Sequence, residues 1–221
     1  MSPAVRAAAI ARKPTAADAG DKANRRAALV RASARLFRDK GFAATTVRDI
    51  AGAVGMRSGS PFYHFANKQE ILKAVMEEGL RQGLERTRAA LAASTTPQER
   101  FRALVRTHYR ILHDEGSDFI AVMLHDWRSL PPRYKREIVK LKDRYDSLWE
   151  VTLAELIARG LIGVNPPARR TAAEDLKTAR LMIFGAINFS ATWYKPGLGS
   201  PGAMDVEALA ERTVRFFLKD A

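Results

Sequence analysis

The chain has 221 residues, 47% of them hydrophobic, which is enough to bury a core in one large domain or in a small domain followed by a larger one. It has no cysteine, which excludes disulfide bonds, thiolate metal sites and a cysteine nucleophile, and favours the reducing cytoplasm as its location. The formal net charge of +13 is uneven, because residues 1–68 hold 13 Lys and Arg against 4 Asp and Glu, so this end favours a polyanion such as DNA as its partner.

The first segment, residues 1–23, is expected to form a flexible basic arm, because it lacks helical periodicity and contains two prolines and a glycine. Such an arm either reaches a neighbouring minor groove or phosphates, or is an inert tail. Arg6, Arg12 and Lys13 interrupt its alanine-rich start, so no signal peptide is expected. No apolar run in the chain approaches the roughly 18 residues of a membrane span, so no membrane partner is expected either.

A first helix is predicted over residues 24–40, where apolar residues recur at helical spacing on one face and arginines occupy the other. Gly41 is expected to end this helix in a left-handed cap, with Phe42 packed against Phe37. The predicted role of the helix is to brace the two shorter helices that follow it.

The stretch from Thr46 to Lys68 is typical of two short helices joined by a glycine turn, the helix-turn-helix arrangement that places a second helix in the DNA major groove. Thr46 and Asp49 are spaced to form a capping box at the start of the first short helix. Gly55 is expected to supply the positive φ of the turn. The segment Arg57 to Pro61 has little apolar surface, which suits close approach to base edges and phosphates. The alternative is a surface helical hairpin with no partner.

Pro61 restricts how the second short helix begins, because proline inside a helix costs roughly 3 kcal/mol unless it lies in the first turn. We therefore predict Ser58 as the N-cap, with Gly59, Ser60 and Pro61 as the first three helical residues. Arg57 then lies just ahead of the helix, free to reach a guanine or a phosphate.

The run Phe62-Tyr63-His64-Phe65, followed by Asn67-Lys68, resembles the end of the DNA-binding domain of the tetracycline-repressor (TetR) family of bacterial transcriptional regulators. The similarity extends back over residues 25–42. It implies an all-α fold, with an N-terminal three-helix helix-turn-helix domain over 24–68 and a larger helical ligand-binding and dimerisation domain over 69–221. The function that it implies is sequence-specific DNA binding in transcription regulation, with no enzymatic activity.

The resemblance also implies roles for single residues. Tyr63, Lys68 and Thr46 would contact phosphates, and His64 either does the same or is a packed structural residue. Phe62 stands where relatives usually carry a tyrosine, so a hydroxyl is lost and ring packing remains. Phosphate contacts set the register on DNA, whereas base contacts set the sequence preference, which we assign to Arg57, Ser58 and Ser60. The predicted DNA-binding residues are Thr46, Arg57, Ser58, Gly59, Ser60, Phe62, Tyr63, His64 and Lys68.

From residue 69 onward helical periodicity continues with few interruptions, and no segment alternates with period two, so no sheet is expected. A long connecting helix is predicted to end near Ser94, and a capping box at Thr96 and Glu99 opens the next helix. Further helices are predicted up to Pro131-Pro132, from there to 159, and over 171–194 and 205–219.

The resemblance implies that two copies of the chain join through their last two helices, and that this homodimer binds a palindromic operator in double-stranded DNA. The body would enclose a small-molecule effector that shifts the connecting helix and changes the separation of the two DNA-reading ends. Candidate ligand contacts are aromatic or polar groups on otherwise apolar faces, each of which is alternatively a core residue: His108, His125, Trp127, Tyr145, Trp149, Phe184, Asn188 and Trp193. Asn188 is the strongest of these, because a buried amide needs hydrogen-bond partners.

Residues 188–197 resemble, more loosely, a segment of TetR members that control fatty-acid or steroid breakdown, several of which answer to acyl-coenzyme A thioesters. The expected effector is therefore a small apolar or amphipathic ligand, with an acyl-coenzyme A ester as one form of it. In that case Lys195 or Arg180 would meet the phosphates of the ligand. An unrelated hydrophobic drug or aromatic acid fits the same composition.

Three alternatives belong to other classes. One is a DNA-binding protein whose second domain only dimerises, and another is a non-specific DNA-packaging protein. The third is a metal-dependent hydrolase, suggested by His113-Asp114 and His125-Asp126. Adjacent helical residues point apart, however, and no further ligand follows at a metal-like spacing, so no catalytic residue, metal or cofactor is predicted.

Overall fold

The computed structural model describes residues 16–114, 118–163, 171–194 and 205–219, and apart from one isolated bridge all regular structure in these ranges is helical. This confirms the all-α prediction. The elements are α1 (Ala16–Ala44), α2 (Val47–Ala53), the 3-10 helix η1 (Ser60–Tyr63), α3 (Lys68–Ala92), α4 (Pro97–His113), α5 (Asp118–Asp126), the 3-10 helix η2 (Trp127–Ser129), α6 (Pro132–Ala158), α7 (Ala172–Trp193) and α8 (Val206–Phe217).

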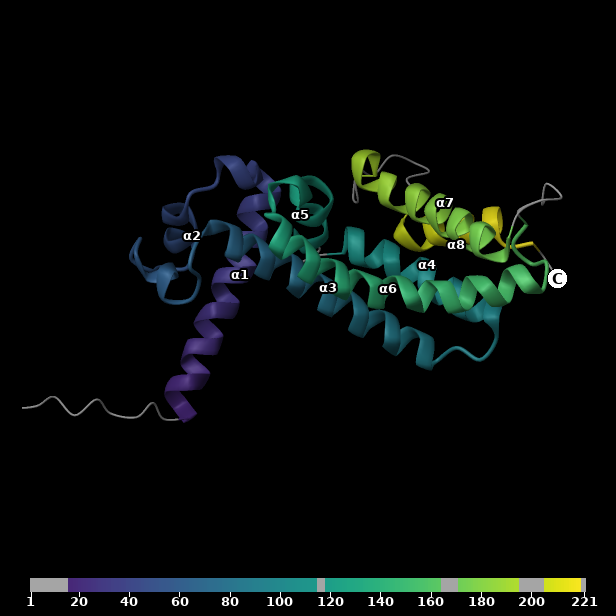
Figure 1. The fold of residues 1–221 in the computed structure, drawn as a ribbon, viewed down its shortest axis with the longest axis horizontal. Helices are drawn as coiled ribbons and strands as arrows, with labels where there is room; N and C mark the ends of the chain where they lie inside the picture. The colour runs from purple at the N-terminus through teal and green to yellow at the C-terminus, as the bar shows by residue number, and fades with distance from the viewer. Residues whose placement is uncertain (1–15, 115–117, 164–170, 195–204, 220–221) are drawn as a thin grey trace, which may run out of the picture.

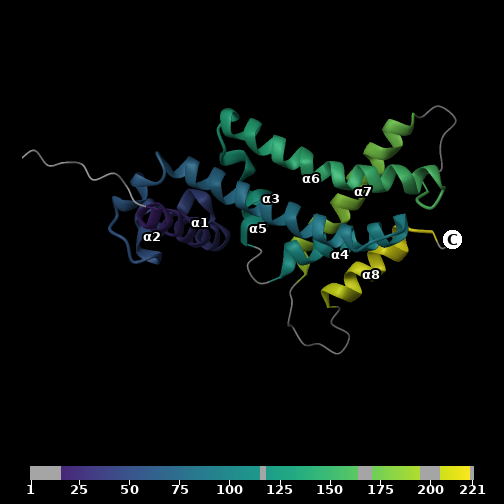
Figure 2. The same cartoon turned by 90° about the horizontal axis from the view of Figure 1, so that it is seen from below.

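The molecule is elongated, with α1, α2 and η1 at one end (Figure 1). We call this end, residues 16–67, the head, and the remaining helices the body. α3 leads from the head into the body, where it packs against α4, α5 and α6. α8 lies along α4, and α7 packs against α6 and α4 (Figure 2).

Two clusters of buried apolar side chains hold the helices together. One lies within the body and contains Trp149 and Phe101, whose rings meet edge to face at 6.4 Å between centroids. The other contains Phe37 of α1 together with Phe119 of α5 and Ile138 of α6, and it extends along the first half of α3. The head therefore shares its hydrophobic core with α5 and with the start of α6.

Helix α1 begins at Ala16 rather than at residue 24, so the last part of the predicted arm, residues 16–23, is helical. The sequence there is rich in alanine, the best helix former, and Asp21 pairs with Arg25 one turn later at 2.6 Å. Its first turns project away from the body (Figure 1). Residues 1–15 lie outside the described residues.

Gly41 interrupts α1 at the predicted position, with a φ of 79° and a ψ of 155°, so its φ is positive but its conformation is more extended than that of the predicted left-handed cap. Phe42 then packs edge to face against Phe37, at 5.4 Å between ring centroids. After this break the chain continues to Ala44 and into the loop before α2.

Candidate DNA-reading head and ligand pocket

Helix α2 is held at its start by the predicted capping box. The N–H of Asp49 donates to Thr46 Oγ1 at 3.1 Å, and the N–H of Thr46 donates to the Asp49 carboxylate at 2.9 Å. The hydrogen bond from the Thr46 N–H to this carboxylate, followed by the interaction with the Thr46 side chain, lowers the pKa of Asp49. Gly55, with a φ of 67°, supplies the predicted positive φ of the turn that follows. The first half of the helix-turn-helix is thus fixed by local chemistry.

The second half differs from the prediction. The segment is the 3-10 helix η1, its N-cap is Gly59 and no side chain caps it, so the assignment of Ser58 as N-cap is wrong. The N–H of Ser60 donates to the carbonyl of Arg57 at 2.9 Å, and Pro61 has no N–H, so Ser58 has neither of the usual donors to cap. Pro61 is buried against the head, which turns Arg57, Ser58 and Gly59 outward.

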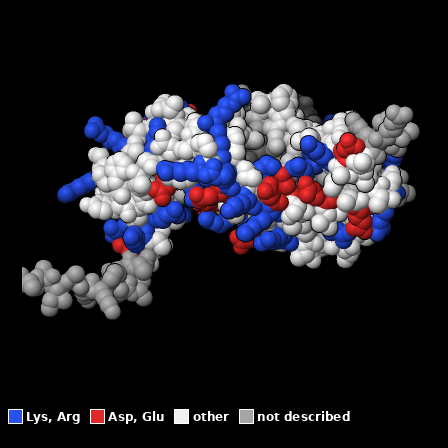
Figure 3. Space-filling view, in the orientation of Figure 1, with Lys and Arg blue, Asp and Glu red and all other residues white. Residues whose placement is uncertain are grey.

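Two aromatic side chains follow Pro61 on the outer surface. Phe62 is 55% exposed and Tyr63 is 82% exposed, whereas Phe65 is buried in the core. Large exposed rings next to small polar residues are typical of a surface that binds a partner. Over the head, Lys and Arg side chains extend into solvent and outnumber the acidic ones (Figure 3), which suits a phosphate backbone as that partner.

His64 and Lys68 have more internal environments. Burial, followed by the charges of Lys22, Arg26 and Arg25, lowers the pKa of His64, and its Nδ1 is buried without a hydrogen-bond partner in the described part of the chain. His64 is therefore a neutral imidazole, half of it packed against the head.

The Lys68 ammonium lies at the junction of α1, α2 and α3. It donates to the carbonyls of Phe42 at 2.8 Å and Thr45 at 2.9 Å, and it lies 4.3 Å from the centroid of the Phe42 ring. These carbonyls lie at the end of α1 and in the loop before α2. Lys68 thus ties the first turn of α3 to the start of the helix-turn-helix.

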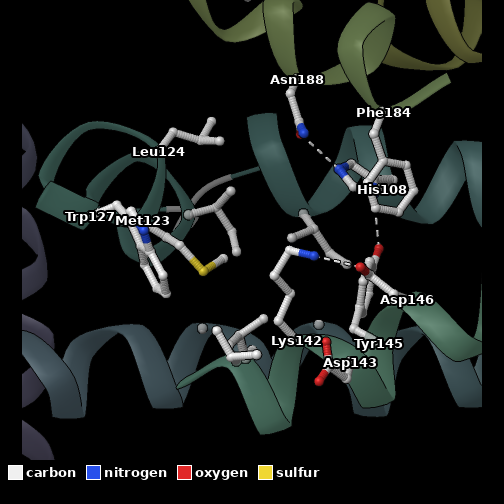
Figure 4. Close-up of a pocket in the computed structure, with 16 residues that line it drawn as sticks. His108, Met123, Leu124, Trp127, Lys142, Asp143, Tyr145, Asp146, Phe184 and Asn188 are labelled. Carbon is white, nitrogen blue, oxygen red and sulfur yellow. Dashed lines mark hydrogen bonds and ion pairs between the residues drawn. The ribbon is translucent and has the colours of Figure 1, made fainter. Parts of the chain in front are cut away.

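The body contains a cavity of about 510 Å³, a size typical of small-molecule sites. Figure 4 shows its lining. Five predicted ligand contacts lie in the wall: His108, Trp127, Tyr145, Phe184 and Asn188. They come from four separate segments, α4, η2, α6 and α7, which the fold brings together around α3.

The other three predicted contacts lie elsewhere. Trp149 is fully buried in the core cluster of the body, edge on to Phe184. His125 is exposed on α5, and Trp193 is half exposed at the end of α7. These residues were selected because they are polar or aromatic, and the relative rotation of the helices places them outside the cavity wall.

Charged residues of α6 line the cavity and were not predicted, namely Lys142, Asp143 and Asp146. Asp146 is 5% exposed and accepts from both Lys142 and Arg180, while Arg180 also pairs with Glu150 at 3.3 Å. Arg180 was expected to meet ligand phosphates, but these two carboxylates already occupy it. Lys195 lies outside the described residues.

A hydrogen-bonded chain runs through the polar end of the cavity. Tyr145 Oη lies 3.0 Å from His108 Nδ1, and His108 Nε2 lies 2.9 Å from Asn188 Oδ1. Because Asn188 presents its amide oxygen, Nε2 carries the proton and Nδ1 accepts from the tyrosine. Burial lowers the pKa of His108 to about 4 and raises that of Tyr145 to about 12. Both groups are therefore neutral.

Exposed apolar side chains gather on the last two helices. Phe189 and Phe216 are 65% and 82% exposed, and the remaining exposed members of the group on α7 are Leu181, Met182 and Trp193. Large exposed apolar residues of this kind are typical of a protein interface. No helix among the described residues is long and apolar enough to cross a membrane.

The geometry defines a helix-turn-helix DNA-binding protein with a small-molecule cavity in its body. Two family models match the chain, "Bacterial regulatory proteins, tetR family" over residues 29–75 and "Tetracyclin repressor-like, C-terminal domain" over residues 94–221. The chain belongs to the TetR family and is a transcriptional regulator of that type.

Individual proteins support this assignment. The HTH-type transcriptional repressor KstR2 of Mycobacterium tuberculosis is 34% identical over 81% of this chain and 86% of its own length. Superantigen PfiT, known from a crystal structure, is 34% identical in sequence to this chain. The two structures match with a TM-score of 0.72 over 95% of this chain and 100% of that chain. AibR in complex with isovaleryl coenzyme A and operator DNA is 23% identical, with a TM-score of 0.76 over 89% of this chain and 100% of that chain, which shows the shared fold.

Proposed function

We propose that the protein is a homodimeric repressor that binds a palindromic operator and leaves it when a small apolar or amphipathic ligand fills the cavity. The position of helix α5 supports this proposal most directly, because α5 lines the cavity and also packs against α1 of the head. The same fold includes a protein named as a superantigen, so the fold alone does not decide function. The capped α2 and the outward-facing segment Arg57 to Tyr63 favour DNA reading.

Helix α5 joins the two sites through opposite faces. Arg38 of α1 pairs with Asp118, and the N–H of Phe42 donates to Asp126 at 3.4 Å. Residues on the other face of α5 and in η2 line the cavity, namely Ile120, Met123, Leu124 and Trp127. A ligand that displaces α5 must therefore displace α1, and with it the start of α2.

The proposed dimer surface is the exposed apolar face of α7 and α8. Two copies joined there would present two heads, and two half-sites about one turn of DNA apart tolerate little change in head separation. The proposal also divides the chain into a DNA-binding part, residues 24–68, and a ligand-binding and dimerisation part, residues 69–221. It places the protein in the cytoplasm, where the operator would lie.

The test of DNA reading is selection of bound sequences from a random DNA pool with the purified protein. We expect a palindrome with two equivalent half-sites, bound at least about a thousandfold more tightly than random DNA. An absence of any enriched motif, with salt-sensitive binding retained, would support the non-specific packaging alternative instead.

Substitutions in the head separate sequence reading from backbone contact. Arg57→Ala and Ser60→Ala should change the preferred base at one position of each half-site, with roughly tenfold loss on the original operator. Tyr63→Phe keeps the exposed ring and removes only the hydroxyl, so it should weaken binding to all sequences alike. Repeating the selection with each variant measures this, and an unchanged base preference in both Arg57→Ala and Ser60→Ala would place the reading residues elsewhere.

The ligand class that we propose to test first is the acyl-coenzyme A esters. AibR was solved with isovaleryl coenzyme A and operator DNA, and KstR2 is named as a repressor. Titrating acyl-coenzyme A esters of graded chain length against the protein–operator complex should release the DNA at micromolar ester. Failure of the whole series to release DNA would remove the thioester, and free coenzyme A serves as the control for the phosphates alone.

A further inference from the structure

We propose that the cavity recognises an uncharged carbonyl oxygen at the polar end of an otherwise apolar ligand, and that the amide nitrogen of Asn188 is the donor. This inference rests on the proposed function, because it assigns the chemistry of the ligand in the same cavity.

The cavity has an apolar end and a polar end (Figure 4). Met123, Leu124 and Trp127 close it on the side of α5 and η2, whereas His108 and Asn188 lie at the other end. An apolar ligand body buries its surface against the first group. Any polar group that it carries must then meet the second group, because a buried polar group without a partner is costly.

The amide of Asn188 is oriented before a ligand arrives. Its oxygen accepts from His108 Nε2, and His108 is in turn fixed by Tyr145. Rings of Trp149 and Phe184 pack around the imidazole, at 5.7 and 5.1 Å between centroids. Within the described residues the amide nitrogen has no hydrogen-bond partner, so its two N–H donors remain for a group inside the cavity.

The charges at this end favour a neutral ligand group. Lys142 and Arg180 are matched by Asp146 and Glu150, and Asp143 adds a further carboxylate to the wall. The wall itself holds two carboxylates, Asp143 and Asp146, against one cation, Lys142, so a ligand carboxylate would meet a net negative environment. A ketone, ester or thioester carbonyl accepts the Asn188 donor without adding charge.

The test measures binding of three matched probes to the full chain in the absence of DNA. Octanophenone carries a ketone next to the ring, and octylbenzene replaces this carbonyl by a methylene. The third probe, 2-phenyloctanoic acid, carries a carboxylate near the same position. Binding is followed by calorimetry or by intrinsic tryptophan fluorescence, to which Trp127 in the cavity wall contributes. We expect about tenfold tighter binding of the ketone than of either other probe.

Asn188→Leu should bring the ketone and the hydrocarbon to equal affinity, so the quantity compared between variants is the ratio of the two affinities. Leu124→Ala is the matched control, because it removes apolar surface and should weaken both probes equally, keeping their ratio. His108→Leu should reduce the ratio as well, since His108 positions the amide, whereas general damage to the cavity lowers both affinities together.

Equal binding of ketone and hydrocarbon by the unaltered chain would overturn the inference, as would preference for the acid or failure to bind any probe. Retention of the ketone preference in Asn188→Leu would overturn the role of Asn188. Because no DNA is present, these outcomes are independent of operator selection, so the carbonyl inference and the DNA-binding proposal fail separately.

Discussion

Replacing Lys68 with methionine should lower the free energy of unfolding by about 2–3 kcal/mol and weaken operator binding at least tenfold. The ammonium donates to the carbonyls of Phe42 and Thr45, and methionine leaves them unpaired. Thr45 directly precedes Thr46, the N-cap of α2. Loosening this junction therefore disturbs the position of the outward-facing segment Arg57 to Tyr63, which we call the reading segment. Urea unfolding and operator titration measure the two effects.

Lys40→Met is the matched control, because Lys40 is exposed on α1 and its loss removes the same charge. It should change stability by less than about 0.5 kcal/mol. If Lys68→Met weakened DNA binding while unfolding like the control, the lysine would act on a phosphate, as the family resemblance implies, and the carbonyl contacts would be incidental.

Lowering the pH from 7 to 5 should destabilise the protein by about 2 kcal/mol through His108 alone, approaching 3 kcal/mol near pH 4. Burial holds the folded-state pKa at about 4, below the ordinary value of 6.5. The unfolded chain therefore binds a proton as the pH falls through 6.5, whereas the folded chain binds it only near pH 4. Stability is full above the unfolded-state pKa and is lost as the pH falls between these two values.

His108→Gln should remove this component, because glutamine does not titrate but retains hydrogen-bonding groups. His113 and His64 also have lowered pKa values, both through burial first, so some acid destabilisation must remain in the variant. The quantity to compare is the change in unfolding free energy between the two pH values. An equal change in the variant and the unaltered chain would contradict the buried, neutral His108, and His125→Gln at an exposed position is the control.

Much of the fold follows from local sequence chemistry. Three capping boxes, at Thr46, Thr96 and Thr171, all form, and the glycine breaks at Gly41 and Gly55 adopt positive φ. Of these, the boxes at Thr46 and Thr96 and both glycine positions were predicted, because each depends only on residues a few positions apart. The segment Arg57 to Tyr63 was harder, because it forms a 3-10 helix that begins after Gly59 instead of the helix that was expected to begin after Ser58.

The cavity was only partly predictable. Its wall combines residues from helices far apart in the sequence, so membership depends on how each helix is rotated against its neighbours. Lys142 and Asp146 lie one turn apart on α6, a spacing that is typical of solvated ion pairs. In the fold, Asp146 is buried and also pairs with Arg180 from α7. The local sequence does not predict this ion pair, because the two residues lie on different helices.

The shared core of head and body has a consequence for building hybrid regulators. Phe119 and Val122 of α5 and Ile138 of α6 are buried in the same cluster as Phe37 of α1. A hybrid that joined this chain to a foreign body after residue 68 would leave part of that cluster facing unrelated side chains. The smallest transplantable unit is therefore discontinuous in sequence, and exchanging operator specificity between relatives is better done by replacing the outward-facing residues of the reading segment within an intact chain.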